Sequence, residues 1–343
     1  MSGITVTGDN SWLESYDDAG RLVAGPTGFQ ADFVPSLGGT FLEDQAAHYV
    51  YASSMHTPLH TAIQKFDKSL AFVDEHILFD HILGTNESNS MTHIGDRLYV
   101  VTIDIDPGVI WELDLAGNLL RTLTLGTVVV GKPWVSVSQD ENYLFAASPF
   151  SPQNGGVSKT AVATGVSVSL PWNTFDDVDP QIASIDDKLE GIFDARELPG
   201  GDLLLMGVEG SWARVRASDG HIVRLYNNPR WNLLDLLSMA LTSDGQSFWS
   251  GGFGVPSDFG LANPPGYTGG ACGIIVRQSV ASGATELAFA TKGIPSQLWV
   301  WTDQPAPVLN LGPPAARVVT DIFTVTLPPQ PGPVLTPPPS EGT

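Results

Sequence analysis

A hairpin with a polar turn recurs along the chain about every 48 residues, and this repeat limits the possible folds more than any other feature. The six copies turn at Gly20, Ser69, Gly117, Gly165, Gly220 and Gly283. Successive turns are 49, 48, 48, 55 and 63 residues apart. Glycine supplies the positive φ that a tight reversal needs, and neighbouring Asp or Ser side chains bond to the turn backbone. We therefore predict a repeat architecture of antiparallel hairpins.

A second repeated element is a short apolar strand roughly 20 residues before most of these turns. Its six copies span residues 48–52, 97–101, 143–147, 203–207, 247–251 and 297–301. Several copies follow one further strand and a polar turn, so each unit contains four strands. A meander of four antiparallel strands is one blade of a β-propeller. The predicted fold class is therefore an all-β propeller.

The offset between the two repeats bears on the number of blades. The first hairpin, 12–25, has no full strand partner before it, and the last short strand, 297–301, has no hairpin after it. Pairing these terminal segments gives six blades and closes the ring. In the alternative, residues 317–327 (RVVTDIFTVTL) belong to a seventh blade.

The segments PWVSVSQDENYLFAAS (133–148) and LDLAGNLLRTL (113–123) show the blade pattern best. Together they resemble propellers of the NHL and lactonase-like (gluconolactonase-like) type, over residues 4–301 as architecture. The resemblance implies blade construction, and unrelated functions share this scaffold. Gluconolactonase-like propellers hold a central metal with Glu, Asn and Asp. Glu190-Gly191 is similar to their Glu-Gly start, but no Asn and Asp partners match.

Composition excludes several classes of protein. The 37 acidic and 16 basic residues give a net charge of −21, which provides no basic patch for nucleic acid. The 36 glycines and 26 prolines argue against a helical bundle. Cys272 is the single cysteine, so an internal disulfide framework is excluded, and we expect a buried apolar role for it. We identify no secretory signal and no transmembrane segment.

Long connections identify a candidate binding face. In a four-strand meander, successive connections alternate between the two ends of the blade. The long ones are predicted at 53–60, 148–156, 171–191 and 251–273, which gather on one face, with short helices at 179–191 and 229–237. Functional residues often lie on such loops. The predicted binding residues are His56, His60, Trp172, Asp176, Asp177, Asp179 and Tyr267.

These residues have a structural interpretation as well as a functional one. His56 and His60 could bind a metal or lie scattered on the surface. The acidic stretch 171–190 could bind calcium or be a solvated loop, since it lacks EF-hand spacing. Trp172, Trp231 and Tyr267 could stack on a sugar or anchor loops. We predict no catalytic residues, because no nucleophile elbow, P-loop or dinucleotide fingerprint is present.

The chain is predicted to divide into a propeller, 1–304, and a proline-rich arm, 305–343, which holds 11 of the 26 prolines. Such runs favour an extended polyproline conformation. The arm could be a solvated tail, or its strand-like segment 317–327 could add to a sheet edge of its own ring or of a neighbour.

These features favour a non-enzymatic structural or interaction propeller. In its sharpest form it is a virion component, such as a phage tail, baseplate or decoration protein. Its partners would be neighbouring subunits, a receptor or cell-surface carbohydrate, without membrane insertion or nucleic acid. The alternative is a soluble, metal-dependent lactonase-type hydrolase, with a cytoplasmic location.

Overall fold

The computed structural model describes residues 2–8, 12–28, 33–43, 48–56, 60–67, 69–77, 88–102, 108–125, 134–148, 156–170, 192–207, 212–226, 229–231, 234–268, 270–292 and 295–302. The chain divides into two units, Met1–Gln304 and Pro305–Thr343. The second unit lies wholly outside the described residues, so the predicted character of the arm stays a prediction, as does the role of residues 317–327.

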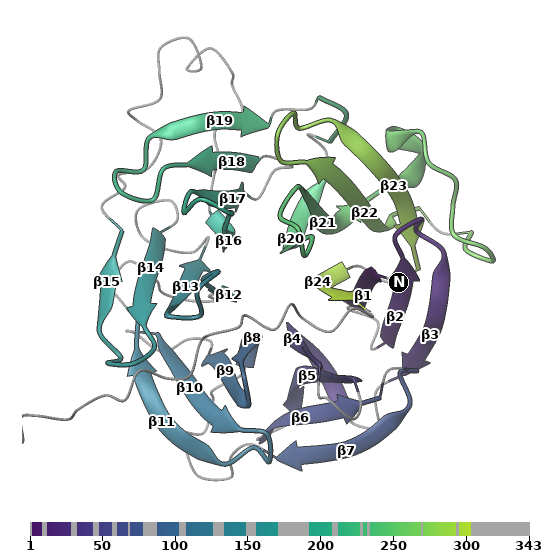
Figure 1. The fold of residues 1–343 in the computed structure, drawn as a ribbon. Helices are drawn as coiled ribbons and strands as arrows, with labels where there is room; N and C mark the ends of the chain where they lie inside the picture. The colour runs from purple at the N-terminus through teal and green to yellow at the C-terminus, as the bar shows by residue number, and fades with distance from the viewer. Residues whose placement is uncertain are drawn as a thin grey trace, which may run out of the picture. The chain divides into compact units, whose positions relative to one another are not determined.

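The described strands form six four-stranded antiparallel sheets (Figure 1). Five sheets follow chain order: β4 (Phe33–Glu43), β5 (His48–His56), β6 (His60–Phe66) and β7 (Phe72–Ile77); β8 (Ser88–Ile94), β9 (Arg97–Thr102), β10 (Val109–Asp114) and β11 (Leu119–Thr124); β12 (Trp134–Val137), β13 (Tyr143–Ser148), β14 (Gly156–Ala161) and β15 (Ser167–Ser169); β16 (Ile192–Glu197), β17 (Leu203–Gly207), β18 (Trp212–Val215) and β19 (Ile222–Tyr226); β20 (Asp235–Leu241), β21 (Ser247–Gly254), β22 (Cys272–Ser279) and β23 (Thr285–Thr291). The remaining sheet has the order β24 (Pro295–Thr302), β1 (Ser2–Gly8), β2 (Trp12–Asp17) and β3 (Leu22–Gly28).

The first strand of each sheet contacts the first strand of the next sheet around a common centre. These contacts join β4 to β8, β8 to β12, β12 to β16, β16 to β20, β20 to β24, and β24 to β4. The fourth strands lie at the outside of this unit (Figure 1). The predicted propeller of four-stranded antiparallel blades is therefore confirmed.

The sheet that joins both ends of this unit differs from the predicted pairing in one respect. Residues 297–301 were expected to be an inner-blade strand next to the first hairpin, but β24 is instead the innermost strand. Ser2–Gly8 forms β1 between β24 and β2, with Ile4 opposite Val300 and Tyr16. The first residues of the chain thus supply the second strand of this sheet.

Aspartate side chains shape the first three hairpin turns. Asp17, Asp67 and Asp114 each accept bonds from the backbone N–H groups two and four residues later, at 2.8–3.0 Å. The residue three positions after each Asp has positive φ: 72° at Gly20, 63° at Leu70 and 82° at Gly117. The predicted turn position Ser69 was therefore wrong by one residue, because Ser69 occupies the place where the N–H bonds to Asp67.

Buried polar side chains connect the innermost strands. Four junctions show the same arrangement, in which a side chain bonds to the backbone of the next innermost strand. Ser90 Oγ accepts from Val135 N–H at 3.3 Å, Ser136 Oγ donates to Ala195 O at 2.5 Å, Asp194 accepts from Met239 N–H, and Ser238 Oγ donates to Pro295 O at 3.2 Å. The four polar side chains are at most 1% exposed. Adjacent sheets are thus held together at the centre by satisfied buried hydrogen bonds.

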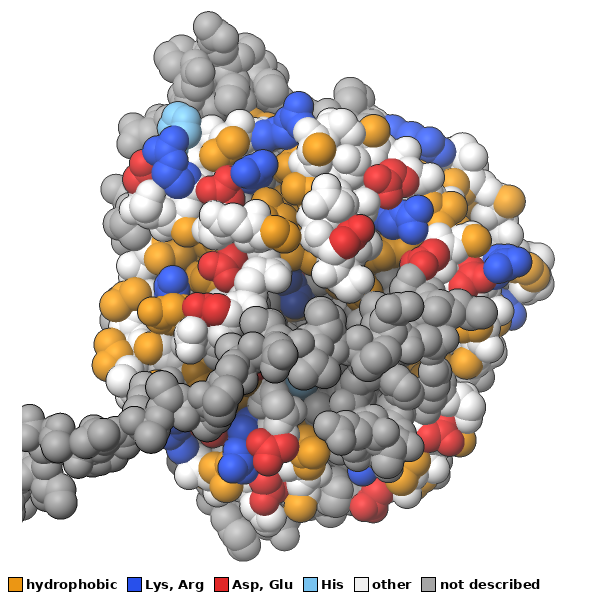
Figure 2. Space-filling view, in the orientation of Figure 1, with side chains coloured by type: hydrophobic (Ala, Val, Ile, Leu, Met, Phe, Trp, Pro, Cys, Tyr) orange, Lys and Arg blue, Asp and Glu red, His pale blue; other side chains and the backbone are white. Residues whose placement is uncertain are grey.

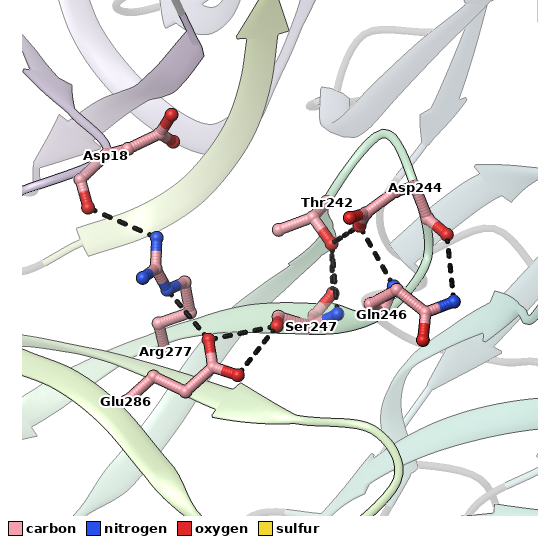
Figure 3. Close-up of polar contacts among 7 residues, drawn as sticks. All are labelled: Asp18, Thr242, Asp244, Gln246, Ser247, Arg277 and Glu286. Atoms are coloured by element: carbon pink, nitrogen blue, oxygen red, sulfur yellow. Dashed lines mark hydrogen bonds and ion pairs between the residues drawn. The ribbon is translucent and has the colours of Figure 1, made fainter.

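The sheets also meet farther out, through more exposed contacts. Arg277 on β22 pairs with Glu286 at 3.0 Å and donates to the backbone carbonyl of Asp18, in the β2–β3 turn of the neighbouring sheet (Figure 3).

In the same sheet, the turn before β21 is closed by Thr242 and Asp244, which bond to each other at 2.7 Å (Figure 3). Apolar clusters fill the space between sheets, such as Phe145 and Val157 against Leu205.

Candidate interaction surface

The longest described connection joins β21 to β22, and the structure describes its residues 255–268, 270 and 271. It begins with a 3-10 turn, Pro256–Phe259, which starts on proline and ends on Gly260 in the left-handed region, φ 64°. Proline fixes φ for the first position of such a turn, and glycine accepts the left-handed backbone that ends it. We call residues 255–271 the β21–β22 connection. By chain order it lies on the face that the sequence predicted to bear long loops.

This connection is fixed to the core by an aromatic pair. Phe259 is 2% exposed and stacks on Trp231, with ring centroids 5.4 Å apart and planes inclined by 19°. The Trp231 indole N–H donates to Thr285 Oγ1 at 3.0 Å. Trp231 follows Pro229 and Arg230 in a second 3-10 turn, so two connections of the same face pack together. This packing fixes the 3-10 turn at the start of the β21–β22 connection to the core.

Arg230 completes this anchor from the solvent side. Its guanidinium lies over the Trp231 ring, 4.8 Å from the centroid, and its Nε donates to the Phe259 carbonyl at 2.9 Å. Nη2 also donates to that carbonyl. A planar guanidinium suits this combination of stacking and forked hydrogen bonding, which lysine cannot reproduce.

Tyr267 is the one predicted binding residue that the structure describes in a loop. It is half-buried, its N–H donates to Pro264 O at 3.0 Å, and its hydroxyl donates to Ala271 O at 2.5 Å. The hydroxyl is therefore used inside the connection. This contact corresponds to the loop-anchoring alternative, and the stacking role stays a prediction.

The exposed part of the connection is polar, small and almost uncharged. Its exposed residues are Ser257, Asp258, Gly260, Ala262, Asn263, Pro265, Gly266, Thr268 and Gly270. Only Asp258 carries a charge. On the face displayed in Figure 2, the described acidic and basic side chains are interspersed. Neither the connection nor the displayed face therefore has the excess of one charge sign that would favour a strongly charged ligand.

The other predicted site residues divide into two groups. His56 and His60 end β5 and begin β6, and they are register partners. The predicted loop 53–60 was therefore wrong, because strand pairing continues to both residues. Trp172, Asp176, Asp177 and Asp179 lie outside the described residues, as does the predicted helix 179–191. The calcium and metal interpretations of these residues remain predictions.

A second correction concerns the predicted helix at 229–237. Among the described residues of this stretch, the helical part is the 3-10 turn Pro229–Trp231, and β20 begins at Asp235. The proline does start a helical turn, as expected. Pairing with β21 from Asp235 onward ends it, because strand hydrogen bonds then take the backbone groups.

Two titratable groups on the innermost strands, Asp194 and His93, have pKa values shifted by burial. Asp194 is 1% exposed and accepts from Arg196 Nη2 at 2.7 Å. Burial raises the pKa of Asp194, while the Arg196 guanidinium opposes that shift. Burial lowers the pKa of His93 on β8 to about 4, so its imidazole is uncharged at neutral pH. Within the described part of the chain, no three His, Cys, Asp or Glu side chains are grouped as metal ligands.

Cys272 has the predicted buried position. Its side chain is 1% exposed at the start of β22, and burial raises the pKa of the thiol to about 11. A thiol needs a lowered pKa to act as a nucleophile near neutral pH. The expectation of a small buried apolar residue is confirmed.

No described helix has the length and apolar character that a membrane crossing requires. Sequence reasoning missed Arg230 and Phe259, the residues that fix the connection. The signals available were Pro-Arg-Trp at 229–231 and Pro-Ser-Asp-Phe-Gly at 256–260, each with proline at the start of a turn.

Neither a protein-family model nor a curated protein matches the chain. Among solved structures, it is similar to a protein of unknown function from Bacteroides caccae, with 11% identity, a TM-score of 0.58, and coverage of 87% of this chain and 98% of that one. It is also similar to a chain in the nidogen/laminin complex, with 10% identity, a TM-score of 0.61, and coverage of 89% and 100%. A third similar structure is the WD40 β-propeller domain of Doa1, with 12% identity, a TM-score of 0.50, and coverage of 85% and 80%. At these identities the likeness shows the propeller fold alone.

Proposed function

We propose that this protein is a non-enzymatic interaction propeller, which binds a protein partner through the β21–β22 connection. The observation that carries this proposal is the anchoring of a long connection by Phe259, Trp231 and Arg230. Two antiparallel strands need only a short turn to connect them. A long connection held in one arrangement therefore has a use beyond chain continuity, and rigid loops bind with less loss of conformational entropy.

The exposed chemistry of the connection supports a protein partner. Antibody binding loops are rich in Tyr, Ser, Gly and Asn, because small polar residues adapt their hydrogen bonds to a protein surface. Ser257, Asn263, Gly266 and Tyr267 belong to this set. One structurally similar propeller was solved in the nidogen/laminin complex. That likeness makes a protein-binding role compatible with the fold.

The finer form of the proposal is a subunit of a larger assembly. We place the protein in a virion, as a phage tail, baseplate or decoration component that contacts a neighbouring subunit, a receptor or cell-surface carbohydrate. Its propeller would be complete with six blades, closed by the pairing of β24 with β1, and of the NHL or lactonase-like type. Six described sheets support that count. The acidic stretch 171–190 could add a calcium ion.

The test compares two alanine-to-arginine variants. Ala262→Arg changes an exposed residue of the β21–β22 connection, and Ala116→Arg changes an exposed residue of the β10–β11 turn. These two connections lie at opposite ends of their blades. The tagged chain is purified from an extract of its source organism, and bound proteins are quantified by mass spectrometry. We expect one stoichiometric partner to be lost with Ala262→Arg and kept with Ala116→Arg; a partner kept by both variants contradicts the proposal.

The alternative function is metal-dependent lactone hydrolysis, carried over from the resemblance at Glu190-Gly191. It predicts hydrolysis of γ- or δ-lactones with added Ca²⁺ or Zn²⁺, abolished by chelation and unchanged by Ala262→Arg. Such activity would replace the interaction proposal.

A further inference from the structure

The outer strand β15 differs from the other outer strands in carrying neither charge nor proline. Its sequence is Ser-Val-Ser. Charged side chains or proline occur in the other five: Pro26 in β3, Asp74 in β7, Arg121 in β11, Arg224 in β19 and Glu286 in β23. Proteins use such residues to prevent further strands from pairing with a sheet edge. Among the described residues, the shortness of β15 is the one such protection of this edge.

The apolar side chains at this edge are strongly exposed. Val166 is 61% and Val168 is 51% exposed, the highest values among the exposed large apolar residues that the structure describes. Because the two residues are two positions apart in extended backbone, they lie on one face. Ser167 and Ser169 alternate with them, so this edge has an apolar face and a hydroxyl face.

Backbone groups at the edge remain available. Ala161 N–H bonds to Val166 O, and Leu170 N–H bonds to Val157 O, both at 2.9 Å. The residues of β15 that pair inward are therefore the even-numbered ones, and the backbone groups of Ser167 and Ser169 point outward. No described residue bonds to those outward N–H and C=O groups. Among the described residues β15 is the outermost strand of its sheet (Figure 1), so these groups can pair with one more strand.

The segment 322–327, Ile-Phe-Thr-Val-Thr-Leu, has the complementary alternation. Phe323, Val325 and Leu327 share one face of an extended strand, and Thr324 and Thr326 share the other. Aromatic or aliphatic side chains opposite valine, and Thr opposite Ser, are favourable cross-strand pairs. The segment also has no charged residue, so it contributes no charge repulsion of its own against the uncharged Ser-Val-Ser edge.

We propose that residues 322–327 of a second copy of this chain add to the free edge of β15 as a fifth strand. Residues 303–316, which precede the segment, include four prolines, and proline-rich spacers are stiff. A stiff spacer favours pairing with a neighbouring copy over pairing within one chain. The contact joins two different surfaces, so it is heterologous and generates rings or filaments. It uses the outer edge of the ring and does not depend on the β21–β22 connection.

Cysteine cross-linking of full-length chains tests this contact directly. One copy carries Val168→Cys and the other Val325→Cys, and Cys272 is buried. Each chain then has one accessible new thiol, so a covalent product forms only between copies. We expect a cross-linked dimer after treatment with a short bismaleimide. The matched control replaces Val168→Cys by Val223→Cys, a 46% exposed valine on β19. No dimer, or an equal yield with the control, overturns the proposal.

Sedimentation analysis supplies the non-covalent test. We expect the average mass of the wild-type chain to rise with concentration, Val168→Lys and Val325→Pro each to abolish that rise, and Val223→Lys to leave it intact. Circular dichroism checks that each variant keeps its strand content. A wild-type chain that stays monomeric at tens of micromolar overturns the proposal. Loss of assembly with Val168→Lys but not with Val325→Pro also overturns it, in favour of β15 pairing with β15.

Discussion

One sheet of this propeller, β16–β19, contains two ion pairs of the same chemistry in two different surroundings. At the centre, Arg196 and Asp194 are 2.7 Å apart, and their side chains are 19% and 1% exposed. In the same sheet, Arg214 and Asp202 are also 2.7 Å apart, but their side chains are 37% and 21% exposed. The two pairs have the same residue types and the same distance, so they differ mainly in their access to water.

This difference distinguishes a buried carboxylate that bonds to a neighbouring sheet from an ion pair that lies at the surface of one sheet. Asp194 also accepts from the N–H groups of Ala195 and Met239, so it satisfies donors on two sheets. A buried polar group that loses its partner keeps its full desolvation cost, whereas an exposed one is solvated again by water. The central bonds should therefore be costly to break, and the outer ones should not.

The largest effect is expected for Asp194→Ala. The substitution leaves the Arg196 charge and the Met239 N–H without their acceptor in a buried site. Breaking a buried ion pair in this way costs about 3–5 kcal/mol of unfolding free energy. Asp202→Ala removes the more exposed carboxylate, and surface pairs contribute less than about 1 kcal/mol. Chemical denaturation followed by tryptophan fluorescence measures both.

Two further results would decide this comparison. Asp194→Asn keeps an oxygen acceptor and removes the charge, so its loss of unfolding free energy should lie between wild type and Asp194→Ala. Equal losses for Asp194→Ala and Asp202→Ala would mean that burial does not distinguish the two pairs, and the contrast between centre and surface would be wrong.

Ser136→Ala is expected to have the next largest effect. Ser136 and Ser158 are both 0% exposed. Ser136 Oγ bonds to the Ala195 carbonyl of the next sheet, while Ser158 Oγ has no hydrogen-bond partner among the described residues. Leaving a buried acceptor unpaired costs about 1–3 kcal/mol. Ser158→Ala, the matched control, should be neutral or slightly stabilising, and melting temperatures of the two variants test this; a larger loss for Ser158→Ala would contradict the role of junction bonds.

Much of the architecture was available in the sequence because turns recur with their chemistry. Gly20, Gly117, Gly165, Gly220 and Gly283 all have positive φ, as the spacing indicated. The error at Ser69 has a local cause, since Leu70 adopts the left-handed backbone without being glycine. The inner position of β24 was missed for a different reason. The β-branched residues 4–7 favour a strand, but the strands that pair with it are distant in sequence, so its place in the sheet could not be inferred.

The candidate surface was only partly predictable. Its place on the β21–β22 connection followed from the length of that loop, but the residues that fix it did not. Phe259 and Trp231 are 28 positions apart, and their stacking depends on how two connections pack. Arg230 bonds to a backbone carbonyl, and because every residue has one, the sequence does not identify this partner. Tyr267 was correctly placed in the loop, while its hydrogen bond inside the loop could not be inferred.

Gly20→Ala is expected to have a smaller effect. It tests whether the close contact between the β2–β3 turn and Phe289 of the neighbouring sheet limits the size of the residue at position 20. Gly20 has φ 72°, and a Cβ there would lie 2.8 Å from Phe289 Cδ1 of the neighbouring sheet. Gly95 has φ 54° and nothing within 4 Å of that position. Left-handed backbone alone costs a non-glycine residue about 1–2 kcal/mol. Gly95→Ala should show only this cost in unfolding free energy, and Gly20→Ala should exceed it. Equal costs would mean that Phe289 moves away freely.

Asp114→Ala should have the smallest effect and the clearest dependence on pH. The Asp114 carboxylate accepts from Asn118 Nδ2 at 2.8 Å and from two backbone N–H groups, and these bonds lower its pKa from the ordinary value of 3.8. Because the folded-state pKa is below the unfolded value, this contribution is present above pH 3.8 and declines as the pH falls below it. The difference in unfolding free energy between wild type and Asp114→Ala should therefore shrink between pH 6 and pH 2.5. Asp114→Asn, which keeps an acceptor oxygen, should show a smaller difference at pH 6. A difference that stays constant with pH would show that the ionised carboxylate does not stabilise the turn, and one larger than that of Asp194→Ala would reverse the order of centre and surface.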